Sequence, residues 1–582
     1  MHVLNRIGMT QAVRARFAHL RTGADCTFLV WLGGMTIGLA VALWLYGWRI
    51  AMPGNVGWLL QGGDISSPFL GWDMFRRDSW HWPPGANPML GDMAPNSIVF
   101  TDSVPLVALA LKPLHAVLPD PFQYQGFVLF ANFMLNGAFA ALLAWRLGAR
   151  MIPALAMAAF CATASIVTAR GPGGHGHIAL TAHWLILAAL TLAWTAQAMP
   201  PRRRYFAWAL LVAGTSLIHF YLLVMVLALW AADWVLRWII RPLERRTLLL
   251  HAVALGLLLA CVMYLAGYLS GAKGVMPDAG GFGGFSANLL SFIDPSSGAW
   301  FFHTNDGLTS MSVFLRDQAD WSGGQYEGNA YMGAGLLLVV VIGAAFWLRG
   351  EQLRPSSESI AVGTAAVLLA LLALSNVITL GSHVLVKVGL PPFFATLAGV
   401  VRASGRFIWV LFYLLAFSAI ASIARSLRPS RAALVMLCAL VIQFVDLAPW
   451  HGWLRRATDT QAVMPDETRD ARVDAMMRGA RRMVFLPVMD IPFDYVPFTY
   501  VAARHHMSVN ATYTARSSGE AIARANEAET RKVLEEHVPT DEVFVVGPHQ
   551  AVSEKACARS DMKCLTLDSG MVVMRATGSV DQ

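Results

Sequence analysis

The sequence predicts an all-α polytopic membrane protein of about eleven transmembrane helices, followed by a small extracytoplasmic α/β domain. Two observations support this fold class. Of the 582 residues, 56% are hydrophobic and only 14% are charged, whereas charged residues make up about 25% of an ordinary soluble domain. The apolar residues also gather into runs of about 20, the length that crosses a bilayer as a helix. A soluble enzyme is therefore excluded.

We expect one membrane-spanning helix in each of eleven apolar runs. The first run follows a basic cytoplasmic leader, residues 1–26, and is too long for the apolar core of a cleavable signal peptide, so it is expected to be a signal anchor. In chain order the runs are 27–48, 123–145, 151–169, 178–198, 205–219, 220–238, 247–269, 330–348, 359–379, 405–424 and 431–449.

A twelfth run, 97–118, is excluded as a span by the placement of arginine. It contains two prolines, which interrupt helices, and two charged residues. If it does not span, the leader and all later arginine clusters share one face, as the positive-inside rule requires of the cytoplasmic side. We therefore expect one or two helices along the outer surface here.

The positive-inside rule also accounts for the net charge of +8 (44 basic minus 36 acidic residues), so the charge does not imply a nucleic-acid partner.

The same topology places three long segments on the outer face. Two are loops of the membrane domain 27–449, namely 49–122 and 270–329, and the third is the tail 450–582. A membrane protein with its polar residues on one side is expected to act there. The tail is expected to fold as the α/β domain, with strands at 482–488, 542–546 and 571–575 and a helix across 518–537.

Two cysteines lie close together in the tail. Cys557 and Cys564 are seven positions apart, and an extracytoplasmic compartment permits a local disulfide between them. The other four cysteines fall singly in apolar runs, where they are expected to pack as small apolar residues.

The first outer loop is rich in aspartate and tryptophan. Asp64 follows two glycines, and Asp73 and Asp102 lie further along. Such carboxylates can accept a proton from a sugar hydroxyl or hold a divalent ion, while Trp72 and Trp80 could stack on a sugar ring. Two plainer interpretations stay open: tryptophan is common at membrane interfaces, and aspartate beside glycine or proline commonly forms turns.

A second outer loop reads ARGPGGHGH over residues 169–177. Arg170, His175 and His177 could contact a phosphate together with exposed backbone N–H groups. The His-x-His pair supplies only two of the ligands that a metal site needs. A plain flexible turn is the third interpretation.

Arg402 and Arg406 lie four positions apart at the entry to the tenth run, so they share one face of the helix near the outer surface. They could hold a donor phosphate with their planar guanidinium groups or extend to lipid headgroups. His219 and Tyr221, near the outer end of the sixth run, could line the same cavity or simply hydrogen-bond between helices.

The run GGDISSPFLGWDMFRRDSWHWPPGANPMLG, followed by TDSVPLVALALKP, resembles an uncharacterised family of bacterial polytopic membrane proteins. More loosely, a first span, an outer loop opening with an aspartate and a Pro-Leu surface segment resemble the GT-C-fold glycosyltransferases, such as protein mannosyltransferases and aminoarabinose transferases. The resemblance covers about residues 27–449 and implies a GT-C-like membrane domain.

This resemblance implies an inverting transferase of hexosyl or pentosyl groups in the bacterial cytoplasmic (inner) membrane. Its partners would be the bilayer, a polyprenyl-phosphate-linked sugar and a glycan, lipid or protein acceptor, with the tail domain periplasmic or extracellular. Asp64 would be the catalytic base, Asp73 the second candidate, and Asp102 would lie near the acceptor. Arg402 and Arg406 would bind the donor phosphate.

The sequence departs from the GT-C pattern at residues 169–177, which lack the acidic residue that several such enzymes carry there. A divalent cation, Mg²⁺ or Mn²⁺, is therefore left open, and its ligands are unknown. Two other functions stay open as well: a transporter or lipid flippase, and a non-catalytic envelope-assembly protein on the same scaffold.

Overall fold

The computed structural model describes most of the chain. The described residues are 26–93, 96–195, 199–270, 281–295, 310–316, 318, 320–349, 355–460, 463–489, 494–510 and 519–577. The basic leader lies outside them, apart from Cys26.

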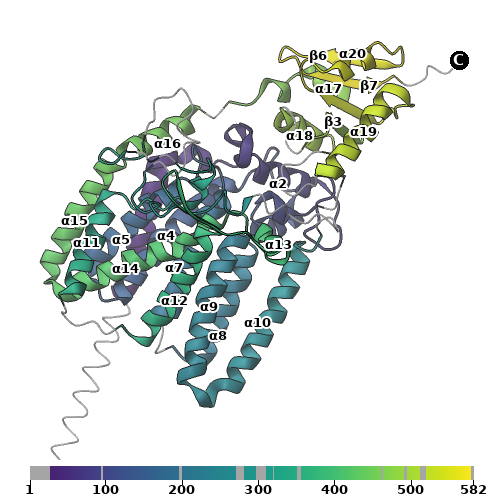
Figure 1. The fold of residues 1–582 in the computed structure, drawn as a ribbon. Helices are drawn as coiled ribbons and strands as arrows, with labels where there is room; N and C mark the ends of the chain where they lie inside the picture. Colours follow the sequence, from purple (N-terminus) through teal and green to yellow (C-terminus); the bar gives the residue numbers. More distant parts are fainter. Residues whose placement is uncertain are drawn as a thin grey trace, which may run out of the picture.

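A bundle of helices occupies the predicted apolar runs (Figure 1). In the described part of the chain, eight helical segments are long and apolar enough to cross a membrane. The predicted spans in α5, α8 and α11 form shorter helices of 13, 16 and 15 residues. The bundle helices are Cys26–Tyr46, α4 (Gln125–Arg146), α5 (Met151–Thr163), the segment Ile178–Thr195 that contains α7 (Trp184–Leu190), α8 (Pro201–Ser216), α9 (Phe220–Ile240), α10 (Arg245–Ala266), α11 (Ala334–Leu348), α12 (Ser357–Leu374), α14 (Trp409–Ser426) and α15 (Pro429–Asp446).

Small residues bring the bundle helices close together. A Cβ atom added to Gly34 would lie 2.4 Å from the carbonyl oxygen of Gly137 in α4, and one added to Gly38 would lie 2.0 Å from that of Phe133. Helices in lipid associate through such close backbone contacts, since burial of apolar side chains contributes little there.

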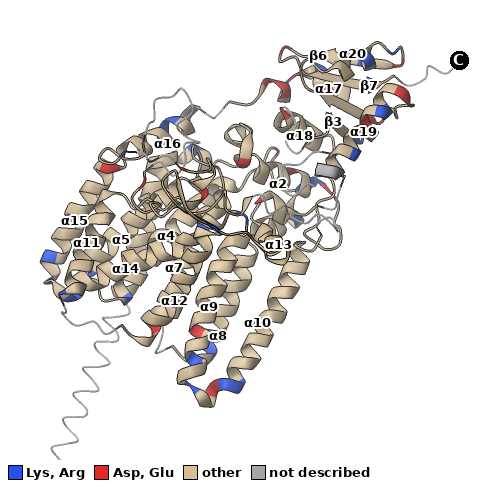
Figure 2. Cartoon of the chain, viewed as in Figure 1, with Lys and Arg blue, Asp and Glu red and all other residues tan. Residues whose placement is uncertain are grey.

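The bundle helices carry their charged residues mainly near their ends, and one end is rich in arginine (Figure 2). At this arginine-rich end, α4 finishes at Arg146, α9 carries Arg237 in its last turn and α14 carries Arg425. The opposite end bears the first outer loop and the small sheet domain (Figure 1).

The run 97–118, which was predicted to lie along the outer surface, forms only short helices. It contains the 3-10 helix η4 (Ile98–Thr101), the seven-residue helix α3 (Pro105–Leu111) and the 3-10 helix η5 (Lys112–Leu114). The run 359–379 is shorter than expected, because Ser375 takes a left-handed backbone (φ 61°) that ends α12. An unpredicted hairpin of β1 (Val377–Leu380) and β2 (His383–Lys387) and a helix, α13 (Pro392–Val400), follow.

The tail forms a five-stranded sheet covered by helices, as the predicted α/β domain requires. The strand order is β4-β3-β5-β7-β6, with β3 parallel to β4 and β5, and β7 antiparallel to both of its neighbours. Cys557 and Cys564 form a disulfide between α20 and β6. The sequence did not predict β4, β6, α17, α18 or α20. The elements are α16 (Ala448–Thr460), α17 (Ala471–Met477), β3 (Arg482–Leu486), α18 (Tyr495–Arg504), β4 (Ser508–Val509), α19 (Gly519–Glu535), β5 (Glu542–Val546), α20 (Ala551–Cys557), β6 (Met562–Thr566) and β7 (Val572–Ala576).

The sheet domain is attached to the first outer loop. The amides of Gly91 and Asp92 donate to the carbonyl oxygen of Val509 at 2.8 and 2.9 Å. The Asp92 carboxylate pairs with Arg482 at 2.7 Å and accepts from the Ser508 hydroxyl at 3.0 Å. These contacts fix the edge strand β4 beside the loop that carries the aspartates.

Candidate functional site

A cavity of about 240 Å³ opens at the end of the bundle opposite the arginine clusters. Segments far apart in the sequence line it. Its polar lining includes Asp64, Asp102, His177, His219, Tyr221, Tyr326, Glu327, Arg402 and Arg406.

Asp64 lies in the short 3-10 helix η3 (Gly63–Ile65). The two glycines before it are required, since Gly62 and Gly63 have φ values of 91° and 68°, which side-chain-bearing residues rarely adopt. The Gly62 amide donates to the Ser66 hydroxyl at 2.9 Å, which closes the turn. The Asp64 side chain remains 30% exposed and faces the cavity.

His177 lies between two carboxylates. Its Nε2 is 3.4 Å from Asp64 Oδ2, and its Nδ1 is 3.5 Å from Asp102 Oδ2. The preceding Gly176 permits this approach: its φ is 76°, and an added Cβ would lie 2.6 Å from the Cβ of Ile65. The glycines of this loop thus serve close packing against η3.

Asp102 is held on a constrained turn. Asp102 and Val104 have φ values of 53° and 49°, a region that β-branched residues such as valine avoid. The intervening Ser103 fixes the turn, because its hydroxyl donates to the Pro68 carbonyl at 2.8 Å and its own carbonyl accepts from the Tyr124 hydroxyl.

A second imidazole contacts Asp102 from the start of α9. His219 Nε2 lies 3.4 Å from Asp102 Oδ1. Burial alone would raise the pKa of Asp102, but His219 and His177 outweigh burial and hold this pKa well below its usual range. Asp102 is therefore ionised at neutral pH, and the four side chains form a continuous chain Asp64, His177, Asp102, His219.

A second group of charged residues at the cavity is built around Glu327. Arg406 contacts the Glu327 carboxylate through two hydrogen bonds of 2.8 and 2.5 Å, and Arg170 through one of 2.6 Å. Burial raises the pKa of Glu327, but the two guanidinium groups outweigh this and hold it well below its ordinary value. Two cations face one anion here, so this cluster carries one excess positive charge.

These contacts change the expectation for the arginines. Arg406 lines the cavity, but its planar fork is already occupied by Glu327 and stacks over Tyr221 at 4.6 Å. Arg402 is half-buried, with its guanidinium 6.0 Å from the Phe285 ring. No carboxylate of the described chain lies within ion-pair distance of Arg402, so this is the guanidinium open to an incoming anion.

Arg170 and His175, which were predicted to contact a phosphate, do not line the cavity. Arg170 is 1% exposed and held by Glu327. His175 is buried and stacks on Tyr326 at 4.5 Å. Burial, assisted by the charge of Arg170, lowers the pKa of His175 well below its ordinary value. A neutral, buried imidazole offers no charge to a phosphate.

Three residues of α2 (Ser67–Arg77) and the loop after it also lie off the cavity. Asp73 is fully buried, and its carboxylate pairs with Arg76 at 2.8 Å and Arg77 at 3.2 Å, which makes it a structural ion pair. Trp72 is fully buried in the core. Trp80 is half exposed but lies beside Lys112.

Glu327 is a site residue that was not predicted from the sequence. It lies in the long loop 270–329, whose acidic residues show no spacing that identifies a role. The only signal is an acidic residue near the start of a span, which is too general to single out Glu327.

Among the described residues, no group of three or more His, Cys, Asp or Glu is placed to hold a metal ion, so no metal ligand is assigned.

Comparison with known proteins places the chain in a family. The model described as "Domain of unknown function (DUF6311)" matches residues 35–448, and the model "DUF6311 C-terminal domain" matches residues 472–576. Among solved structures, the chain is similar to the crystal structure of ArnT from Cupriavidus metallidurans in the apo state, with 11% identity, a TM-score of 0.47, and coverage of 94% of this chain and 98% of that one. The search of curated proteins gives no match. Since the first model matches more than half of its length, the chain belongs to the DUF6311 family, an uncharacterised family as the first outer loop indicated.

Proposed function

We propose that this protein is a membrane glycosyltransferase that moves a sugar from a polyprenyl-phosphate donor to an acceptor hydroxyl at the outer face of the membrane. The observation that carries the proposal is that carboxylates and guanidinium groups line one cavity together. Asp64 and Asp102 flank His177, and Arg402 and Arg406 line the same cavity. Glycosyl transfer needs a proton acceptor and positive charge at the leaving phosphate.

In the proposed reaction, Asp64 accepts the proton of the acceptor hydroxyl. The acceptor oxygen forms a bond to the anomeric carbon while the bond from that carbon to the phosphate oxygen breaks. The phosphate leaves with the electron pair, and a single displacement inverts the anomeric carbon. His177, 3.4 Å from Asp64, is a positioning residue that links Asp64 to Asp102.

Arg402 is proposed to bind the leaving phosphate. Its guanidinium and the excess positive charge of the Arg170, Glu327 and Arg406 cluster stabilise the negative charge that develops there. The donor's lipid chain would lie outside the cavity, since about 240 Å³ is below the range of about 300–1,000 Å³ for drug-sized ligands.

The surface next to Arg402 suits such a chain. The helix α13 exposes Phe393, Phe394 and Leu397, whose side chains are 75%, 55% and 58% exposed. The residues that directly follow this apolar face line the cavity. A polyprenyl chain lying along α13 would therefore bring its phosphate to Arg402.

The test compares the surface glycans of three strains: a deletion, the deletion complemented with Asp64→Asn, and the deletion complemented with Asp78→Asn. Asp78 lies in the same outer loop and pairs with His81 outside the cavity, so it is the matched control. We expect Asp64→Asn to lack the same sugar as the deletion, because loss of a general base slows a reaction by about 10²–10⁴-fold. Normal glycans in the Asp64→Asn strain would refute the assignment.

The two rival functions have less support. A transporter needs a route through the bundle, yet this cavity shares no lining residue with the larger cavity at the arginine-rich end. A non-catalytic assembly protein would be expected to pair Asp64 permanently with an arginine. The carboxylate instead lies beside His177.

A further inference from the structure

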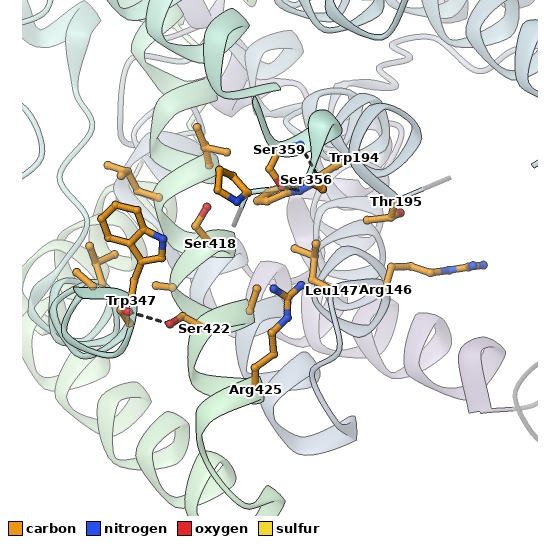
Figure 3. A pocket seen from close by; sticks show the side chains of 18 residues that line it. Arg146, Leu147, Trp194, Thr195, Trp347, Ser356, Ser359, Ser418, Ser422 and Arg425 are labelled. Carbon is orange, nitrogen blue, oxygen red and sulfur yellow. Dashed lines mark hydrogen bonds between the residues drawn. The ribbon is translucent and has the colours of Figure 1, made fainter. Parts of the chain in front are cut away.

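A second cavity, of about 620 Å³, lies at the arginine-rich end of the bundle, and Figure 3 shows its lining. It is formed by the ends of α4, α11, α12, α14 and the segment Ile178–Thr195. Its volume falls within the range of about 300–1,000 Å³ that is typical of sites for small organic ligands. The proposed transferase site does not use it.

The cavity has apolar walls and a polar stripe. Leu147, Val340 and Leu414 are among the apolar lining residues. The stripe consists of Ser418, Ser422 and Arg425, which follow one another at spacings of four and three along α14 and therefore share one face of an otherwise apolar helix. Over these seven residues the helix rises about 10 Å.

The three side chains of this stripe differ in whether they already have a hydrogen-bond or ion-pair partner. Ser422 donates to the Gly343 carbonyl at 2.9 Å. Ser418 is exposed and makes no side-chain hydrogen bond within the described residues. Arg425 extends its guanidinium toward the cavity, whereas Arg146 points away from it (Figure 3). Arg425 also lacks an ion-pair partner in the part of the chain that the structure describes.

We propose that this cavity binds an acidic phospholipid from the leaflet on the arginine-rich side. The order of groups matches that ligand: a cation at the mouth for the phosphate, a free hydroxyl two turns deeper for an ester carbonyl, and apolar walls for an acyl chain. Charge complementarity selects an acidic headgroup, because a guanidinium beside hydrocarbon is costly unless it meets an anion. The proposal is independent of the transferase reaction.

Native mass spectrometry of the full-length protein, with phosphatidylglycerol or phosphatidylcholine added, tests this inference. The wild type should retain phosphatidylglycerol in preference. Arg425→Ala should weaken its retention about tenfold, because a charge-assisted hydrogen bond is lost. The matched control is Arg428→Ala, which removes the same charge from the same end but lies outside the cavity. Ser418→Phe, which fills the cavity, should also abolish retention.

Three outcomes would overturn the proposal: equal retention of the two lipids, equal behaviour of the Arg425→Ala and Arg428→Ala variants, or displacement of the lipid by inorganic phosphate alone. The last outcome would indicate a site for a free anion. A thermal unfolding midpoint is measured for each variant. Since Arg425 is exposed at the end of its helix, Arg425→Ala tests the site even if Ser418→Phe does not fold.

Discussion

Replacing Glu327 with glutamine should destabilise the protein strongly. The Glu327 carboxylate accepts three hydrogen bonds of 2.5 to 2.8 Å from Arg406 and Arg170, all of them buried. Each hydrogen bond to a charged group contributes about 1.5–3 kcal/mol, and the amide oxygen of glutamine keeps part of this. Removing one partner of a buried ion pair costs about 3–5 kcal/mol, because the other charge is left without compensation. We expect a loss in that range.

The assay is thermal unfolding of the purified full-length protein. The matched control is Glu527→Gln, which breaks the pair with Arg531 on the surface of α19, where the two side chains are 74% and 54% exposed. Exposed pairs of this spacing contribute little, so the control should keep the wild-type midpoint. If Glu327→Gln unfolds at the same temperature as Glu527→Gln, the charge balance described for this cluster is wrong.

A double variant isolates the cause of the loss. In Glu327→Gln combined with Arg406→Gln, one of the two unbalanced guanidinium groups is gone. The combined loss should therefore be smaller than the sum of the two single losses, by at least about 0.5 kcal/mol for residues in direct contact. Strict additivity would mean that the two side chains do not interact.

Three further predictions concern pH, the disulfide and the attachment of the tail. Burial lowers the pKa of His175, so the unfolded chain binds a proton that the folded chain does not, and stability should fall as the pH drops below about 6.5. Thermal unfolding across about pH 8 to 5 checks this, and a flat profile would contradict it. Cys557 and Cys564 form a disulfide, so they should be alkylated only after reduction, and alkylation without reductant would disprove the bond. Replacing both by serine should lower the free energy of unfolding by about 2–3 kcal/mol, because the closed loop is lost. Asp92→Asn should weaken the attachment of the sheet domain, since Asp92 is the carboxylate partner of Arg482 that comes from the outer loop, whereas Glu529 and Glu542 belong to the sheet domain itself. Hydrogen exchange at β4 should then quicken, and unchanged exchange would argue against this contact.

Local sequence was sufficient to predict the helices of the bundle. An apolar run of sufficient length forms a helix in lipid because its backbone has no other hydrogen-bonding partners, so α4, α9 and α14 follow directly from composition. The backbone at Asp64 was equally local, since two consecutive glycines permit the left-handed turn before it. Short strands such as β4, with two residues, gave no such signal.

What only the tertiary structure decided is which charged side chains remain available. Asp64 and Asp73 belong to the same loop. Asp73 nevertheless forms a buried ion pair with Arg76, whereas Asp64 faces a cavity. Arg402 and Arg406 share one helix entry, yet Arg406 is held by Glu327, 79 positions earlier in the chain. The physical reason is that the sequence determines which groups partition into lipid or water, whereas the pairing of buried charges depends on partners brought together from distant segments.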